Sequence, residues 1–140
     1  ISRLRISRFS YVNASLKDDL FHRRFERLEL PAVGKVAEEF ARLVRKGYGR
    51  GEAAAMAWIR FGSDGGTLLS SNLRDVGKYS RSNSLNFMCT EDLLCLAVES
   101  GKLAEDQACQ VWRNMKKIGR LLPDYGFAES LRRYREHRLI

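Results

Sequence analysis

The sequence predicts an α/β fold in which helices cover both faces of a short parallel sheet. Two short apolar segments, 67–71 and 85–89, have the length of buried strands and are bounded by turn-forming residues. Longer segments with helical apolar spacing precede, separate and follow them. Because short apolar strands that alternate with helices typically form a parallel sheet buried on both sides, we expect this class, with a high helical content.

Four elements are expected before the first of these strands. Residues 3–12 are rich in β-forming side chains and are expected to form a strand. Apolar residues recur at helical spacing between 15 and 28, and again from Pro31 to a break at Gly47. The alanine-rich segment 52–61 is nearly all apolar, which predicts a well-buried helix.

After residue 66 the expected elements alternate and then become helical. Strand 67–71 precedes a helix capped by Asn72, and strand 85–89 precedes a helix capped by Thr90 and ended by Gly101. Two more helices are expected, over 104–119 and about 126–137. Trp58 and Trp112 lie on apolar helix faces and are interpreted as core residues.

Length and composition predict one globular domain over residues 1–140, with 44% hydrophobic residues and two prolines. No apolar run reaches the ~18 residues that a membrane span needs, and no signal peptide is evident, so we expect a cytoplasmic protein with no membrane partner. The first residue is Ile1, which indicates that the natural N-terminus lies upstream.

The formal net charge of +8 favours a polyanionic partner, nucleic acid above all. The alternative is a solvated basic surface. We interpret the basic residues near the two ends of the chain as such a solvated surface; they are Arg3, Arg5, Arg8, Arg132, Arg133, Arg135 and Arg138.

Three cysteines, Cys89, Cys95 and Cys109, form no C-x-x-C pair and lie among apolar residues. They are interpreted as buried free thiols in a reducing cytosol. The two histidines, His22 and His137, have no ligand spacing to any cysteine, which argues against a zinc site.

Three acidic residues occupy equivalent positions in the expected fold. Glu52 opens a helix after a glycine-rich turn, and Asp75 and Asp92 each follow one of the two strands. Sites in open parallel sheets form beyond the carboxyl ends of the strands, so these carboxylates are expected to converge there. Clustered carboxylates are suitable ligands for Mg²⁺ or Mn²⁺. Such a bound cation can activate water for phosphodiester hydrolysis. The alternative for each acid is a helix cap or a favourable interaction with the helix dipole.

A family resemblance rests on the order of three short motifs. They are Gly51-Glu52-Ala53-Ala54-Ala55-Met56-Ala57, then Leu68-Leu69-Ser70-Ser71-Asn72-Leu73-Arg74-Asp75-Val76, then Thr90-Glu91-Asp92-Leu93-Leu94. With the break at Gly101-Lys102-Leu103 and the segment Gly119-Arg120-Leu121-Leu122-Pro123, the chain resembles a PIN domain over about residues 31–135.

The resemblance implies a three-layer α/β/α fold and a Mg²⁺- or Mn²⁺-dependent ribonuclease, including the toxins of bacterial toxin–antitoxin pairs. It implies that Glu52, Asp75 and Asp92 are the catalytic metal ligands. Asn72 and Thr90 would contact substrate phosphate, and we assign Arg74 and Lys78 the same role. RNA, an antitoxin protein and a second copy of the chain are the partners expected.

One feature departs from the family. PIN domains usually begin with a strand that ends in an aspartate, and residues 1–12 contain no acid. Either that strand lies upstream of Ile1, or the chain is a degenerate member that binds nucleic acid or protein without cleavage. A third alternative is a helical interaction module whose acids only cap helices.

Overall fold

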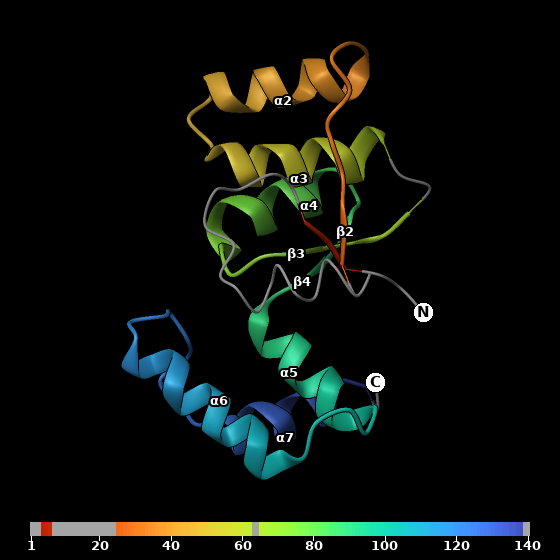
Figure 1. Ribbon diagram of the computed structural model, residues 1–140. Coiled ribbons are helices and arrows are strands. Elements are labelled where there is room, and N and C mark those ends of the chain that lie inside the picture. The colour runs from red at the N-terminus through yellow and green to blue at the C-terminus, as the bar shows by residue number, and fades with distance from the viewer. Residues whose placement is uncertain (1–3, 7–24, 63–64, 139–140) are drawn as a thin grey trace. The chain divides into compact units, whose positions relative to one another are not determined.

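The computed structural model describes residues 4–6, 25–62 and 65–138 (Figure 1). The chain divides into two compact units. Unit 1 consists of Ile1–Leu68 and Arg74–Phe87, and unit 2 of Leu69–Leu73 and Met88–Ile140. The single-domain organisation remains a prediction.

Unit 1 is built on two helices, α2 (Lys35–Arg45) and α3 (Arg50–Phe61), which lie side by side (Figure 1). Its buried core contains Leu43 from α2, Ala53 and Met56 from α3, and the side chains of Leu68, Val76 and Tyr79. The predicted burial of the alanine-rich helix is confirmed, because Ala53, Ala54, Met56 and Ala57 are all buried.

The start of α2 differs from the prediction. The helix begins at Lys35 and not at Pro31, because Gly34 precedes it with a φ of 96°. That left-handed conformation is one that glycine adopts readily and that interrupts a right-handed helix. Val33, one of the apolar residues that the sequence assigns to the helix between Pro31 and Gly47, is consequently outside the helix and 81% exposed.

Four short strands occur in the described residues, and they form two two-stranded sheets. β1 (Leu4–Ile6) pairs in parallel with β2 (Phe25–Arg27), with Leu4 opposite Phe25. The predicted helix was therefore wrong at Phe25–Arg27, and its residues 15–24 lie outside the described part. β3 (Thr67–Leu69) neighbours β4 (Asn86–Met88). A helix-rich mixed α/β class is confirmed, and the three-layer PIN-like arrangement remains a prediction.

Two short helical segments connect β3 to β4. A π-helical turn spans Leu73–Gly77, and α4 (Lys78–Ser82) continues directly from it. Val76 and Tyr79 on these segments are buried in the core of unit 1. The predicted helix after Asn72 is thus present, as a π-turn followed by a short α-helix.

Unit 2 contains three helices, α5 (Thr90–Glu99), α6 (Glu105–Lys117) and α7 (Phe127–Arg138). Their core is centred on Trp112, which is 2% exposed and contacts the Phe127 ring with centroids 6.0 Å apart. Leu94, Cys95, Ala108 and Leu131 complete the buried cluster. The interpretation of Trp112 as a core residue is confirmed. Among the described residues, no helix has the length and apolar character needed to cross a membrane.

Candidate functional site

Glu52 lies in the first turn of α3, as predicted. The helix starts after Gly49, whose backbone is extended, and a methyl group added at Gly49 would lie 3.9 Å from Glu52 Oε2. The Glu52 side chain is half-buried. The local sequence therefore sets the position of this carboxylate, because the glycine-rich turn ends where the alanine-rich helix begins.

Asp75 lies in the π-helical turn after β3 and interacts with its neighbour Arg74. The Arg74 guanidinium donates to both carboxylate oxygens, at 3.2 Å from Nε and 3.3 Å from Nη2. This hydrogen-bonded ion pair raises the pKa of Arg74 above its usual value. Arg74, predicted to contact substrate phosphate, thus holds the adjacent acid in this structure.

Asp92 lies in the first turn of α5 and caps the start of that helix. Its Oδ2 accepts a hydrogen bond of 3.2 Å from the Cys89 backbone N–H and lies 3.1 Å from the Cys89 thiol. The residue at the N-cap is Cys89, so the prediction of Thr90 as the cap was wrong by one residue. Burial raises the pKa of the Cys89 thiol to about 11, and the Asp92 carboxylate adds to the rise. Asp92 therefore has a structural role.

The three predicted ligands belong to different units, since Glu52 and Asp75 lie in unit 1 and Asp92 in unit 2. Within 4–6, 25–62 and 65–138, no group of three or more His, Cys, Asp or Glu side chains is placed to hold a metal ion. Carboxylate oxygens are nevertheless the donors that Mg²⁺ and Mn²⁺ prefer. The donor chemistry fits such a cation, and a shared metal site remains a prediction.

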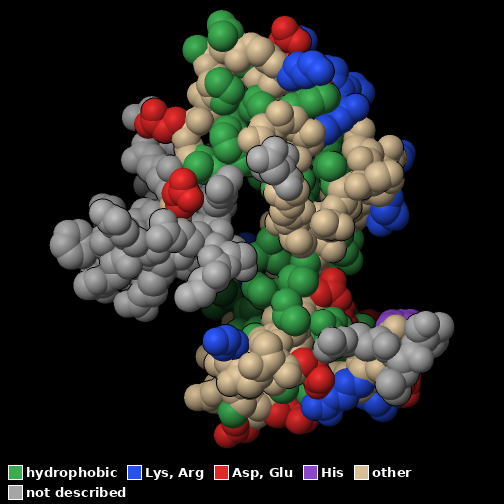
Figure 2. All heavy atoms as spheres, turned by 90° about the vertical axis from the view of Figure 1, so that its right-hand side faces the viewer, with side chains coloured by type: hydrophobic (Ala, Val, Ile, Leu, Met, Phe, Trp, Pro, Cys, Tyr) green, Lys and Arg blue, Asp and Glu red, His purple; other side chains and the backbone are tan. Residues whose placement is uncertain are grey.

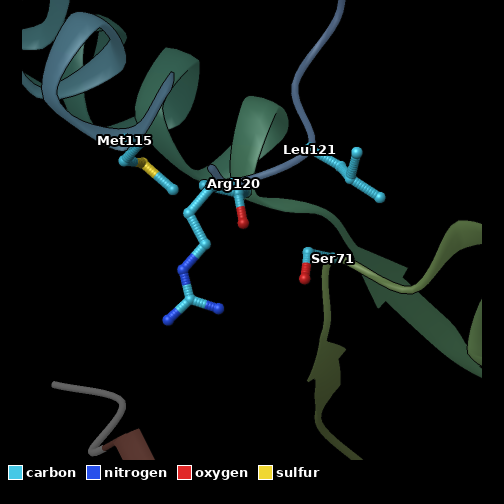
Figure 3. Close-up of a pocket in the computed structure, with 5 residues that line it drawn as sticks. Ser71, Met115, Arg120 and Leu121 are labelled. Carbon is cyan, nitrogen blue, oxygen red and sulfur yellow. The ribbon is translucent and has the colours of Figure 1, made fainter. Parts of the chain in front are cut away.

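A pocket of about 270 Å³ lies in unit 2. It is lined by the residue Ser71 after β3, by Thr90 at the start of α5, and by residues of α6 and of the segment that follows it. Its lining combines two hydroxyl-bearing residues, a guanidinium and two apolar side chains, from Ser71, Thr90, Arg120, Met115 and Leu121. In Figure 3 the Arg120 side chain extends between Met115 on one side and Ser71 on the other. Polar donors and an apolar surface thus meet in one pocket.

Two of the predicted phosphate-contacting residues lie at or next to this pocket. Thr90 is part of its lining, and Asn72 follows the lining residue Ser71 and donates its backbone N–H to Ser70 Oγ at 3.1 Å. Lys78 opens α4 and is exposed. Sequence reasoning missed Ser71 and Arg120 as site residues. Arg120 follows Gly119, which has a φ of 81°, and that glycine was the only available signal that the chain turns there.

Most arginines at the end of unit 2 interact with carboxylates. Arg132 contacts Glu129 and Glu136, Arg133 contacts Glu129 at 2.8 Å, and Arg135 contacts Glu99 at 2.5 Å. In Figure 2, Lys and Arg side chains gather around the part that holds α2 and α3, whereas those near α7 alternate with Asp and Glu. Within the ranges that the structure describes, no carboxylate pairs with Arg120. Arg120 is therefore available to an external anion.

A second polar cluster in unit 2 is structural. Glu91 Oε1 accepts hydrogen bonds from Tyr125 at 2.8 Å and from Ser130 at 2.6 Å. Ser130 is 1% exposed and also lies 3.6 Å from the buried Cys95 sulfur. This cluster joins α5 to α7 and accounts for a buried serine that has no access to a substrate. The three cysteines are free, with Cys95 buried and Cys89 and Cys109 half-buried.

No protein-family model matches the chain, and no curated protein or solved structure is significantly similar to it.

Proposed function

We propose that this protein acts on RNA as a PIN-like, divalent-metal-dependent ribonuclease. The observation that carries the proposal is the pairing of β3 with β4, each followed by a helical segment with an acid in its first turn. Asp75 follows β3 and Asp92 follows β4. In open sheets of parallel strands, ligands bind beyond the carboxyl ends of the strands, and the proposed cation site is of this kind.

The proposed roles follow from the chemistry of the side chains. Glu52, Asp75 and Asp92 would hold Mg²⁺ or Mn²⁺, and the bound cation would supply water activation and charge stabilisation. Thr90 and Asn72 would orient a phosphate, and the positive charge of the chain would attract the RNA backbone. Lys78 would add a further phosphate contact as an exposed point charge.

The test is cleavage of single-stranded RNA with Mn²⁺ present or withheld. The wild type is expected to cleave only with the metal, and Glu52→Gln and Asp75→Ala are expected to abolish cleavage. Glu38→Gln is the matched control for Glu52→Gln, because Glu38 lies in the first turn of the neighbouring helix α2. A wild type that does not cleave, or acid variants that cleave as well as the control, would contradict the proposal.

A second candidate function is RNA binding without cleavage. The observation that favours it is that two of the acids already have structural partners, since Asp75 is paired with Arg74 and Asp92 caps α5. Salt-sensitive RNA binding by a wild type that never cleaves would support this candidate. An antitoxin partner and a homodimer remain predictions from the resemblance alone.

A further inference from the structure

We propose that the pocket around Arg120 binds one phosphate of a single-stranded RNA and packs the adjoining nucleotide against Met115 and Leu121. This inference deepens the proposed function, on which it rests for the identity of the polyanion. It assigns a substrate-binding role to Arg120 and Ser71, neither of which belongs to the predicted set of carboxylates and phosphate contacts.

The polar lining residues of the pocket supply the donors that a phosphate needs. Arg120 supplies a planar guanidinium, which binds phosphate oxygens through two parallel N–H donors. Ser71 and Thr90 each supply a hydroxyl from the same lining. Three arginines of α7 are paired with carboxylates, namely Arg132, Arg133 and Arg135. Arg120 therefore combines an accessible guanidinium with neighbouring hydroxyls inside a hollow.

The apolar lining residues explain why the bound RNA should be single-stranded. Leu121 is 93% exposed and Met115 is half-buried, so both present apolar surface at the pocket. Ile118, three residues before Leu121, is also 73% exposed. An unpaired base can be splayed onto such a surface, whereas the bases of a duplex are stacked inside it. The cavity volume of about 270 Å³ lies just below the range of about 300–1,000 Å³ found for sites that enclose a whole small ligand, which suits a site for one phosphate and part of a nucleotide.

The acids near the pocket already have contacts. The Asp92 carboxylate accepts from the Cys89 N–H, and Glu91 accepts from Tyr125 and Ser130. These bonds hold the Asp92 carboxylate at the start of α5 and the Glu91 carboxylate against Tyr125 and Ser130. An incoming phosphate therefore meets the hydroxyls and the guanidinium as its partners in the lining.

The experiment compares RNA affinity of Arg120→Ala with that of Arg113→Ala. Both variants remove one exposed arginine from unit 2, but Arg113 lies on α6 and donates only to Gln110 in that helix. Fluorescence anisotropy with a labelled single-stranded RNA is measured over a salt series, without divalent metal. Arg120→Ala is expected to weaken binding about tenfold, as the loss of one charge-assisted hydrogen-bonding contact would. It should also lower the slope of log K against log[salt] by about 0.7.

Two further variants distinguish the effect of the Arg120 charge from that of hydrogen bonding in the pocket. Arg120→Lys keeps the charge but loses the planar fork, so its affinity should fall between those of the wild type and Arg120→Ala. Ser71→Ala should weaken binding about threefold without changing the salt slope. A labelled duplex RNA of equal length should show no difference between Arg120→Ala and Arg113→Ala.

The outcomes distinguish the pocket from the nuclease. Equal losses for Arg120→Ala and Arg113→Ala, or no RNA binding by the wild type, would overturn the pocket proposal. RNA cleavage that persists with unchanged KM in Arg120→Ala would overturn it too, while leaving the ribonuclease proposal standing. Loss of binding in Arg120→Ala, with no cleavage by any form of the protein, would support the pocket and contradict the ribonuclease.

Discussion

Tyr79 donates a hydrogen bond of 2.9 Å to Glu39, a residue 40 positions earlier in the chain. Glu39 is only 6% exposed, and it also accepts from Arg42 Nε at 2.8 Å and from Arg60 at 3.1 Å. The carboxylate thereby joins α2, α3 and α4. Arg42, Arg60 and Tyr79 all donate to the carboxylate, so the network stabilises its ionised form. The bond from Arg42 contributes most, and the pKa of Glu39 falls to about 2 despite burial.

Glu39→Gln should destabilise unit 1. The amide keeps one acceptor oxygen but loses the charge that both arginines share, and its NH₂ group faces further donors. Removing one partner of a fully buried ion pair costs about 3–5 kcal/mol. Arg42 and Arg60 keep about a third of their side chains in solvent, so we expect the free energy of unfolding to fall by about 2 kcal/mol, measured in urea. Glu38→Gln on the same helix is the control and should change it by less than about 0.5 kcal/mol. If Glu39→Gln and Glu38→Gln lower the unfolding free energy equally, the hydrogen bonds and ion pairs of Glu39 do not stabilise the fold.

The same carboxylate should make stability depend on acid pH. Its pKa is about 2 in the folded state and 4.5 as an ordinary glutamate, so the folded state favours the ionised form. The stabilisation is therefore complete above about pH 4.5 and is lost as the pH falls towards 2. Wild type and Glu39→Gln should differ in unfolding free energy by about 2 kcal/mol at pH 6, and this difference should shrink steadily as the pH falls towards 2. If the unfolding free energies of the two proteins change in parallel between pH 6 and pH 2, Glu39 does not have the lowered pKa given above.

The sequence predicted most of the helices but not the contacts made by their polar residues. Helical spacing and alanine content placed α3, α5, α6 and α7 to within a few residues, because local apolar periodicity decides such helices. The same periodicity places Glu39 beside Glu38 on the polar face of α2. Its burial depends on Arg60 and Tyr79, which are distant in sequence. Likewise, the strand at Phe25–Arg27 depends on pairing with Leu4–Ile6, which no local pattern encodes.

The candidate site was predictable to a similar extent. The sequence placed Glu52, Asp75 and Asp92 at the starts of helical segments, because glycines and strand ends mark those starts. It did not reveal that Arg74 pairs with Asp75, or that the Cys89 N–H binds Asp92. Arg120 lies in a connection without periodicity, so its place in a pocket depends on the tertiary fold alone.

Asp92→Asn should separate helix capping from catalysis. The asparagine carbonyl oxygen keeps an acceptor for the Cys89 N–H, so the unfolding free energy should fall by less than about 0.5 kcal/mol. Asp92→Ala removes the acceptor and should cost about 1 kcal/mol. If Asp92 is also a metal ligand, both variants should lose Mn²⁺-dependent cleavage. Full cleavage by Asp92→Asn would restrict this acid to its capping role.

Ser130→Ala should weaken the attachment of α7 to α5. The Ser130 hydroxyl is 1% exposed and donates a 2.6 Å hydrogen bond to Glu91, so its removal leaves that carboxylate with Tyr125 as its remaining bond among those described. A hydrogen bond to a charged group contributes about 1.5–3 kcal/mol, and we expect the unfolding free energy to fall by about 1.5 kcal/mol. Ser100→Ala is the matched control, because Ser100 is exposed and bonds only to carbonyls of its own helix. It should cost less than about 0.5 kcal/mol. Equal losses in urea unfolding would mean that the Ser130 bond adds nothing beyond the packing of α7.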